Sequence, residues 1–339
     1  MLKIYTDHQF ITEQYRSCVF PLLFDLCYSK NLKLAEKYQI IYDINHSDIV
    51  IVPIDINNFF INNKTEWLYN FIDNALKIQK KVWIYSGGDY GYSINRPVFT
   101  FRLGGFNSQM DNQTFIMPSF ISDPYDIIQK EFNPIAKNKI PEIGFVGHAS
   151  NSKLKWGKEF LIYLFHIYKR ITKQLFADFH SFYPSTIKRY QYLRLLQKSD
   201  LIKTNFIFRN KYRAGVKTES DRKKTTLDFF ENIASNPYTF CVRGVGNFSV
   251  RFYETLAMGR IPFVIDTDFR LPLEGIVNWE KYCVIVKEGN VCKALIAFHE
   301  EISDIDFKKM QIDNRNLWLN YLNREAYFSE VYSLFKENS

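Results

Sequence analysis

The chain of 339 residues contains 46% hydrophobic and 24% charged residues, a balance that excludes a disordered protein and suits two globular domains. Its formal net charge of +8 favours an anionic partner, but the 44 Lys and Arg residues are spread along the chain, which argues against nucleic-acid binding. The five cysteines form no CxxC pair, which argues against both a zinc ribbon and a disulfide framework.

The first residues, MLKIYTDHQF, do not combine a basic segment with an apolar core, so we expect no signal peptide. No run of eighteen apolar residues follows, so we expect no transmembrane helix. These features predict a soluble, cytoplasmic protein. Its basic surface is compatible with peripheral contact at the inner face of a membrane.

Short apolar runs alternate with helical patterns in the first half of the chain, which is typical of a parallel α/β sheet. Strands are expected at 3–6, 49–54, 82–85 and 98–102, and helices near 15–30 and 67–79. Functional loops in such sheets follow the carboxyl ends of the strands. The candidate loops contain Asp7 and His8, Asp55, and Asp89.

Four prolines between Pro118 and Pro141 interrupt this alternation and predict a linker. A second α/β series follows, with strands expected at 142–146, 205–209, 238–243, 261–266 and 282–286, and helices at 155–173, 227–235, 249–259, 291–302 and 314–335. We therefore expect an N-terminal domain over 1–135 and a C-terminal domain over 140–313. The last helix, 314–339, is expected to pack back onto the N-terminal domain.

The segment 240–265 is predicted to form a strand, a loop, a helix and a second strand. The loop, RGVGNFS, contains two glycines that permit positive φ and a close approach of the backbone to a ligand. The start of the following helix favours a phosphate group, and Arg243 and Arg251 flank it. Glu254 is placed to accept hydrogen bonds from the hydroxyls of a ribose. The alternative is a plain crossover in which Arg251 and Glu254 form a solvated ion pair.

Residues 243–249 (RGVGNFS) and 251–262 (RFYETLAMGRIP) closely resemble the core motif of exostosin-family glycosyltransferases. The resemblance continues in register to residue 286 and is weaker at GFVGHAS and SGGDYG. It implies a GT-B fold, in which two Rossmann-like domains face a cleft, a nucleotide-sugar donor and usually inversion at the anomeric carbon. The animal members are longer and membrane-anchored, so this chain is similar to a bacterial-type member with a single GT-B unit.

The residues expected to bind the donor lie in and around this motif. By the resemblance, Arg243 and Arg251 meet the diphosphate and Glu254 meets the ribose. The complete candidate set is Arg243, Gly244, Gly246, Asn247, Ser249, Arg251 and Glu254, joined by Arg209 and His148 at the ends of two predicted strands. Arg213 is a further candidate source of positive charge.

An inverting transfer requires a base that takes the proton of the acceptor hydroxyl. The candidates follow strands of the N-terminal domain, across the expected cleft from the donor. Asp89, in the SGGDYG turn, is favoured, with His8 and Asp7 next and Asp55 also open. Each of these Asp residues has an alternative role in capping its loop.

No metal or other cofactor is expected. The six histidines form no HxxxH or HExxH array, and the two DxD sequences, at 266–268 and 304–306, are common as turns. The arginines offer an alternative to a metal for stabilising a leaving diphosphate. Asp266 and Asp268 are the alternative metal site.

The sequence therefore predicts a metal-independent glycosyltransferase, hexosyl or related, with a nucleoside-diphosphate sugar as donor and a glycan or glycolipid as acceptor. Synthesis of cell-surface polysaccharide or lipopolysaccharide is the expected setting. Two alternatives are a sugar-nucleotide epimerase of the same fold and a non-enzymatic protein that binds glycans or nucleic acid.

Overall fold

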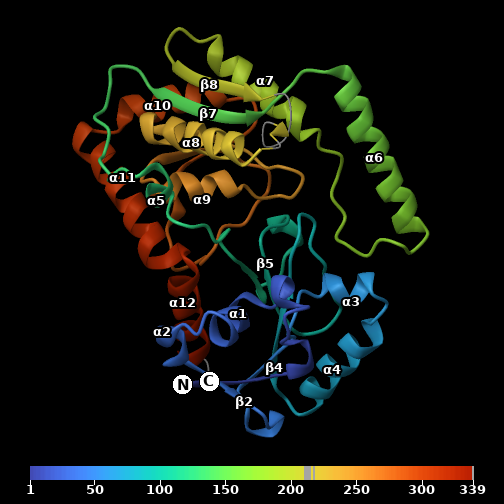
Figure 1. Ribbon diagram of the computed structural model, residues 1–339. Coiled ribbons are helices and arrows are strands. Elements are labelled where there is room, and N and C mark those ends of the chain that lie inside the picture. The colour runs from blue at the N-terminus through green and yellow to red at the C-terminus, as the bar shows by residue number, and fades with distance from the viewer. Residues whose placement is uncertain (210–214, 217, 338–339) are drawn as a thin grey trace.

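The computed structural model describes residues 1–209, 215–216 and 218–337 and contains two parallel sheets, one in each half of the chain (Figure 1). The first sheet has the strand order β2-β1-β3-β4-β5-β6. Its strands are β1 (Leu2–Thr6), β2 (Tyr38–Ile41), β3 (Ile49–Ile51), β4 (Lys81–Ser86), β5 (Phe99–Arg102) and β6 (Thr114–Ile116). Strand β3 is buried along its whole length, which explains its continuous β-branched sequence.

Helices connect the strands of the first sheet and cover it. They are α1 (Pro21–Cys27), α2 (Leu32–Ala35), α3 (Asn57–Ile61) and α4 (Thr65–Lys77). Short 3-10 turns occur at His8–Phe10, Arg16–Cys18, Ile44–His46 and Asn107–Gln109. Buried side chains such as Trp83 and Phe101 fill the core beneath these helices.

The second sheet has the strand order β11-β10-β9-β7-β8. Its strands are β7 (Glu142–His148), β8 (Lys203–Arg209), β9 (Tyr238–Cys241), β10 (Ile261–Ile265) and β11 (Val284–Val286). The helices of this half are α5 (Pro124–Ile128), α6 (Lys153–Ile171), α7 (Ser185–Gln197), α8 (Glu219–Ser235), α9 (Val250–Ala257) and α10 (Val291–Glu301), with a 3-10 turn at Trp279–Lys281.

The C-terminal segment returns to the first sheet. Helix α11 (Asp304–Leu317) is followed by a π-helical turn (Trp318–Leu322) and by α12 (Arg324–Glu337). Helix α12 contributes Phe328 and Phe335 to the core of the first half, and the Tyr38 hydroxyl donates to the Phe328 carbonyl oxygen at 2.7 Å. The expected single helix over 314–335 is wrong, because the chain becomes extended at Asn323, where ψ is 163°.

The predicted α/β fold with two parallel, helix-covered sheets, as expected for the GT-B class, is confirmed by these strand orders. Several elements were not expected from the sequence, namely strands β2 and β6, helices α2, α3, α5 and α7, and most of helix α11. Helix α8 also begins at Glu219, well before the expected residue 227, because its first two turns are polar. No helix in the described ranges is long and apolar enough to cross a membrane.

Candidate functional site

The strand order predicts a ligand crevice at the carboxyl edge of each sheet. In the second sheet β7 lies between β8 and β9, so successive connections leave β7 and β9 in opposite directions. In open parallel sheets ligands bind at the carboxyl ends of the strands at such a point of reversal. There β7 ends at His148, and the loop after β9 begins with Val242 and Arg243. The matching point of the first sheet lies between β1 and β3.

Arg251 carries a positive charge to this edge of the second sheet. It lies in the first turn of α9, and its Nη2 atom donates a hydrogen bond to the Val146 carbonyl oxygen at 2.7 Å. The guanidinium lies 4.3 Å from the centroid of the Phe145 ring. Gly147 leaves space for it, because a Cβ atom there would come within 2.9 Å of an Arg251 nitrogen. Strand β7 therefore positions this guanidinium.

Arg189 and Arg243 bring two further guanidinium groups to the same edge. Arg189, on α7, donates to the carbonyl oxygens of His148 at 2.8 Å and of Arg243 at 3.3 Å. Arg243 is buried, with its guanidinium 4.7 Å from the Tyr183 ring centroid and 5.1 Å from that of Phe106. Carbonyl oxygens and aromatic faces hold these cations in place without neutralising them.

None of these three arginines forms an ion pair within the described ranges, and the Nε atom of each is buried without a hydrogen-bond partner there. Burial lowers the pKa of all three, and burial together with nearby Arg251 lowers that of Arg189 to about 10. Because an arginine side chain is not deprotonated at neutral pH in proteins, all three carry a positive charge. A cluster of uncompensated, partly desolvated cations favours a ligand with several negative charges, such as a diphosphate.

The loop before α9 leaves the positive end of that helix available to a ligand. The Ser249 hydroxyl caps none of the α9 amides in the described part of the chain. Open space surrounds Gly244, whereas a Cβ atom on Gly246 would lie 2.4 Å from the Asp89 carbonyl oxygen. The expected positive φ is found at neither glycine. Gly246 is instead required because the loops of the two sheets touch there.

Glu254 lies one turn after Arg251 on α9, and the solvated ion pair considered as an alternative is not formed between these described residues. Burial raises the pKa of Glu254 to about 7, although Arg251 acts in the opposite direction. Hydrogen bonds from two ligand hydroxyls would favour the ionised form of this carboxyl group.

Arg209 and His148 are neighbours at the ends of β8 and β7. Arg209 donates from Nη2 to the Thr225 carbonyl oxygen at 2.7 Å, and His148 Nε2 lies 2.8 Å from Lys155 Nζ. Burial, Lys155 and Arg189 lower the pKa of His148, which favours its neutral form. Both candidates thus lie beside the arginine cluster. Arg213 lies outside the described residues.

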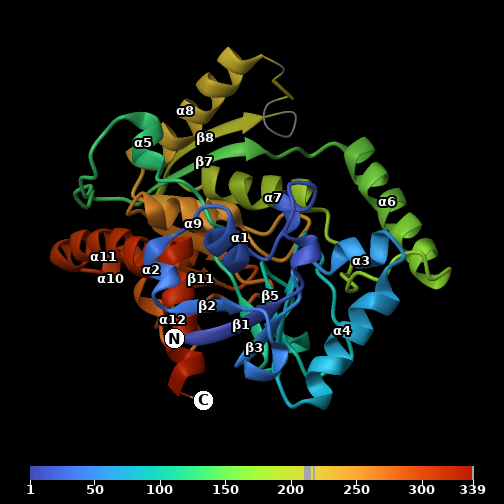
Figure 2. The ribbon, with the colours of Figure 1, turned by 60° about the horizontal axis from the view of Figure 1, so that its bottom comes forward.

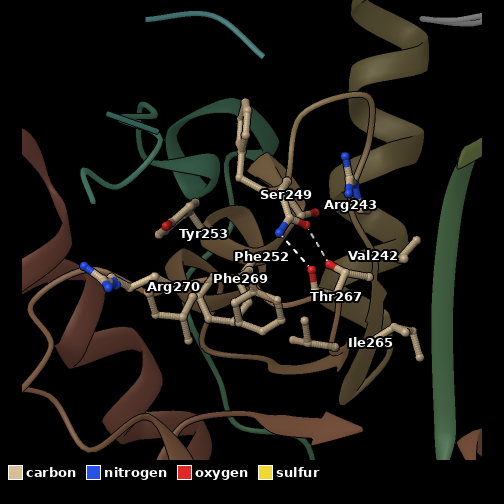
Figure 3. A pocket seen from close by; sticks show the side chains of 13 residues that line it. Val242, Arg243, Ser249, Phe252, Tyr253, Ile265, Thr267, Phe269 and Arg270 are labelled. Carbon is tan, nitrogen blue, oxygen red and sulfur yellow. Dashed lines mark hydrogen bonds between the residues drawn. The ribbon is translucent and has the colours of Figure 1, made fainter. Parts of the chain in front are cut away.

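A pocket opens between the 242–249 loop and α9 (Figure 3). Asn247, 1% exposed, donates from Nδ2 to the carbonyl oxygens of Gly105, Thr267 and Asp268 at 2.9–3.0 Å. Its Oδ1 atom accepts from the Thr267 hydroxyl at 2.7 Å. The polar atoms of Asn247 therefore hold the 242–249 loop against neighbouring segments of the chain. Asn247 would act on a donor indirectly, by positioning this loop.

The two DxD sequences serve as turn and cap residues. Asp266 Oδ1 accepts the Asp268 amide at 2.9 Å, and the Asp268 carboxylate accepts the Ser108 amide and hydroxyl. Asp306 exchanges hydrogen bonds with Ser303 at the start of α11. The described ranges contain no cluster of three or more His, Cys, Asp or Glu side chains suited to a metal ion.

The candidate bases lie at different distances from the donor loop. Asp89 follows β4, and its backbone carbonyl lies close to Gly246, which places the Asp89 loop beside the donor loop; partial burial raises the pKa of Asp89. Asp7 instead caps the 3-10 turn after β1, and the His8 ring stacks on Tyr42 at a centroid distance of 4.8 Å. Of these three candidates, the described contacts bring only Asp89 to the donor loop.

Two residues that the sequence did not single out complete the site. One is Arg189, described above. The other is His180, which is buried with its ring 4.9 Å from that of Tyr90 and its Nδ1 atom 3.3 Å from an Arg243 Nη2 atom. Burial and Arg243 lower its pKa to about 4. No motif marks either residue, since each reaches the crevice only through tertiary folding.

A comparison with known protein families matches the segment that carries most of the candidate donor residues. The family model for the Exostosin GT47 domain matches residues 158–301, which contain Arg189, Arg243, Arg251 and Glu254. The resemblance seen in the sequence is confirmed over residues 158–301, fewer than half of the 339 residues, which match the exostosin GT47 domain of glycosyltransferases. No curated protein matches the sequence.

Similar solved structures include a glycosyltransferase from Rickettsia africae ESF-5, at 13% identity and a TM-score of 0.39, covering 100% of this chain and 99% of that one. TarM shows 10% identity and a TM-score of 0.36. The match covers 85% of this chain, and this chain spans 54% of the length of TarM. WaaG, a glycosyltransferase involved in lipopolysaccharide biosynthesis, shows 8% identity and a TM-score of 0.31, covering 99% and 98% of the two chains. At these TM-scores, the fold assignment rests on the strand orders given above.

Proposed function

We propose that this protein transfers a sugar from a nucleoside diphosphate to a hydroxyl group of a glycan or glycolipid, with inversion and without a metal ion. The observation that carries the proposal is the cluster of Arg189, Arg243 and Arg251, which has no carboxylate partner among the described residues and lies at the carboxyl edge of the second sheet. The exostosin GT47 match over the same segment supports it.

In the proposed reaction the three guanidinium groups and the start of α9 bind the diphosphate, and Glu254 accepts hydrogen bonds from the ribose. Negative charge grows on the diphosphate as its bond to the anomeric carbon breaks. Cations already fixed at that position stabilise this charge without reorganising, which is the principal source of electrostatic catalysis. His148 and Arg209 border the same edge.

The acceptor hydroxyl attacks the anomeric carbon from the face opposite the leaving diphosphate, and the configuration inverts. Asp89, whose loop lies beside the donor loop, takes the hydroxyl proton. A single displacement of this kind requires no covalent intermediate. We place the reaction in cell-surface polysaccharide or lipopolysaccharide synthesis, on the cytoplasmic side and in peripheral contact with the membrane.

A screen of nucleoside diphosphates for thermal stabilisation, followed by incubation of the best binder's sugar conjugates with glycan acceptors, tests this function. Stabilisation by UDP or GDP and sugar transfer to an acceptor are expected. Conversion of the donor sugar without any acceptor would identify an epimerase instead. Tight binding of an oligonucleotide, without nucleoside-diphosphate binding, would overturn the proposal.

A further inference from the structure

Helix α6 is packed differently from the other long helices of the protein. It comprises 19 residues, and none of them is buried. In both ribbon views it lies at the edge of the molecule, on the side opposite α10 and α11 (Figures 1 and 2). A long helix without buried residues must derive its stability from one partly covered face or from a surface that the isolated chain lacks.

One face of α6 is held by aromatic contacts. The rings of Trp156, Phe160 and Tyr163 surround Phe182 at centroid distances between 5.3 and 5.6 Å. Further along the same face, the His166 ring lies 5.7 Å from that of Tyr90. These contacts fix the rotation of the helix about its axis, and therefore determine which side chains face outward.

The outward face is apolar. At 100° per residue its side chains fall within an arc of about 100°. Leu154 is 87% exposed, Leu161 67%, Tyr168 58%, Phe165 52% and Leu164 44%. Water contact on this many large apolar side chains of a single helix is costly, and such a face is typical of an interaction surface.

Cationic side chains accompany the apolar stripe. Lys158 and Lys169 lie along one margin and Lys153 along the other, as the same helical spacing shows. Between residues 153 and 173 the chain has six Lys or Arg residues and a single acidic residue, Glu159. Glu159 projects towards the inner face, away from the stripe.

We propose that the outward face of α6 docks the protein onto a bilayer surface that contains anionic lipids. An apolar stripe flanked by lysines suits insertion at the boundary between headgroups and acyl chains, with the lysines among the anionic headgroups. A second copy of the chain would instead bring equally cationic margins together, so charge complementarity favours the bilayer.

The position of α6 relates this surface to the crevice. Tyr163 and Arg170 from its inner side line a second pocket together with Tyr90 and His180. His180 contacts Arg243 of the arginine cluster. Docking through α6 would therefore hold the crevice close to the bilayer. The docking itself does not depend on the proposed transferase activity.

Flotation of the full-length protein with lipid vesicles tests the proposal. Vesicles of phosphatidylcholine alone are compared with vesicles containing roughly 30% phosphatidylglycerol, whose negative surface potential attracts lysines. Binding to the second kind only, weakened by high salt, is expected. The variant L161S/F165S should bind at least about tenfold more weakly, and K158E/K169E should do so as well.

Matched control variants carry the same changes on the opposite side of the molecule. I305S/I312S removes two exposed apolar side chains of α11, 80% and 42% exposed, and K293E/K308E reverses two exposed charges. Both should retain vesicle binding. Since all substituted residues are exposed or half-buried, unchanged melting temperatures should accompany every variant.

Sedimentation of the wild-type protein without lipid tests whether a second copy of the chain, and not a bilayer, covers the outward face of α6. Failure of the wild type to bind anionic vesicles would overturn the proposal. So would equal loss of binding in the α11 controls. If the wild type does not bind vesicles but forms a dimer, and L161S/F165S is monomeric, the surface belongs to a contact with a second copy of the chain.

Discussion

Replacing Arg251 by methionine tests whether this arginine binds a ligand or only supports the fold. Methionine keeps an unbranched apolar stem against Phe145 and removes the charge. The free protein loses the hydrogen bond to the Val146 carbonyl oxygen, and an unpaired buried carbonyl costs about 1–3 kcal/mol. It also loses repulsion, because Arg251 lowers the pKa of Arg189, and Arg209 lowers that of Arg251. The two effects oppose each other, so we expect a melting temperature close to that of the wild type.

Ligand binding should respond very differently. A charge-assisted hydrogen bond contributes about 1.5–3 kcal/mol, so loss of one Arg251 contact to the diphosphate should weaken nucleoside-diphosphate binding about ten- to 150-fold. Titration calorimetry with the nucleotide that best stabilises the wild type measures this change. The stabilisation by saturating nucleotide should shrink accordingly in a thermal scan.

Arg260 provides a matched control, since it is also a buried arginine next to an aromatic ring, Phe132. Its guanidinium donates to the carbonyl oxygen of Ala234 at 2.8 Å, and Arg260 directly precedes β10, at the edge of the sheet opposite the carboxyl ends of the strands. Arg260→Met should lower stability by about 1–3 kcal/mol and leave nucleotide affinity unchanged. The reasoning is refuted if Arg251→Met behaves like Arg260→Met, with stability lost and affinity retained.

Three further predictions concern the donor site. Glu254→Gln should weaken binding of ribonucleotides but not of pyrophosphate in calorimetry, and equal losses for both ligands would contradict a ribose contact. The pKa of Glu254 is raised from 4.5 to about 7, so between these pH values the folded state binds more protons than the unfolded state. The free energy of unfolding should therefore fall as pH rises through this range, and it should fall less in Glu254→Gln. Sugar transfer should persist in excess chelator, because the arginines and the α9 N-terminus supply the positive field; a loss restored by manganese or magnesium would point to Asp266 and Asp268.

The sequence predicted elements whose local pattern matches their final environment. The run Ile49–Ile51 reads as a buried parallel strand because both of its faces are covered. Helix α7, Ser185–Gln197, has a mixed pattern, and five of its side chains become buried only through contacts with distant segments. Strand β2, Tyr38–Ile41, is short and lies at the edge of the sheet, where partial exposure weakens the apolar signal.

The same distinction holds at the site. Arg243, Arg251 and Glu254 could be predicted because one continuous segment carries them and the start of a helix gives their spacing a chemical meaning. Arg189 could not, because only the packing of α7 brings it within 2.8 Å of the His148 carbonyl oxygen. The sequence likewise could not show that the Asn247 amide group donates its hydrogen bonds to three carbonyl oxygens of distant segments, because only the folded chain brings these groups together.

The identity of the catalytic base is the prediction that tests the geometry of the crevice most directly. Asp89 is the favoured base because its loop touches Gly246 and because partial burial raises its pKa, which makes the carboxylate a stronger base. General-base help contributes about 10²–10⁴-fold to the rate, so Asp89→Asn should lower kcat at least about a hundredfold. Donor affinity should stay within about threefold of the wild type, since the base acts on the acceptor.

His8→Ala and Asp7→Asn are the comparison variants, because both residues follow β1 and are engaged locally, His8 with the Tyr42 ring and Asp7 with the turn that it caps. Each should reduce kcat less than Asp89→Asn, as measured by initial rates at saturating donor and acceptor. Normal turnover of Asp89→Asn together with a large loss in His8→Ala would reverse the assignment. If none of the three variants is impaired, the base is Asp55 or a residue outside the candidates named above, and Asp55→Asn is the next variant to measure. The Asp55 carboxylate, which accepts the Gly87 amide at 3.1 Å, has its pKa raised by burial and lies beside the loop that carries Asp89.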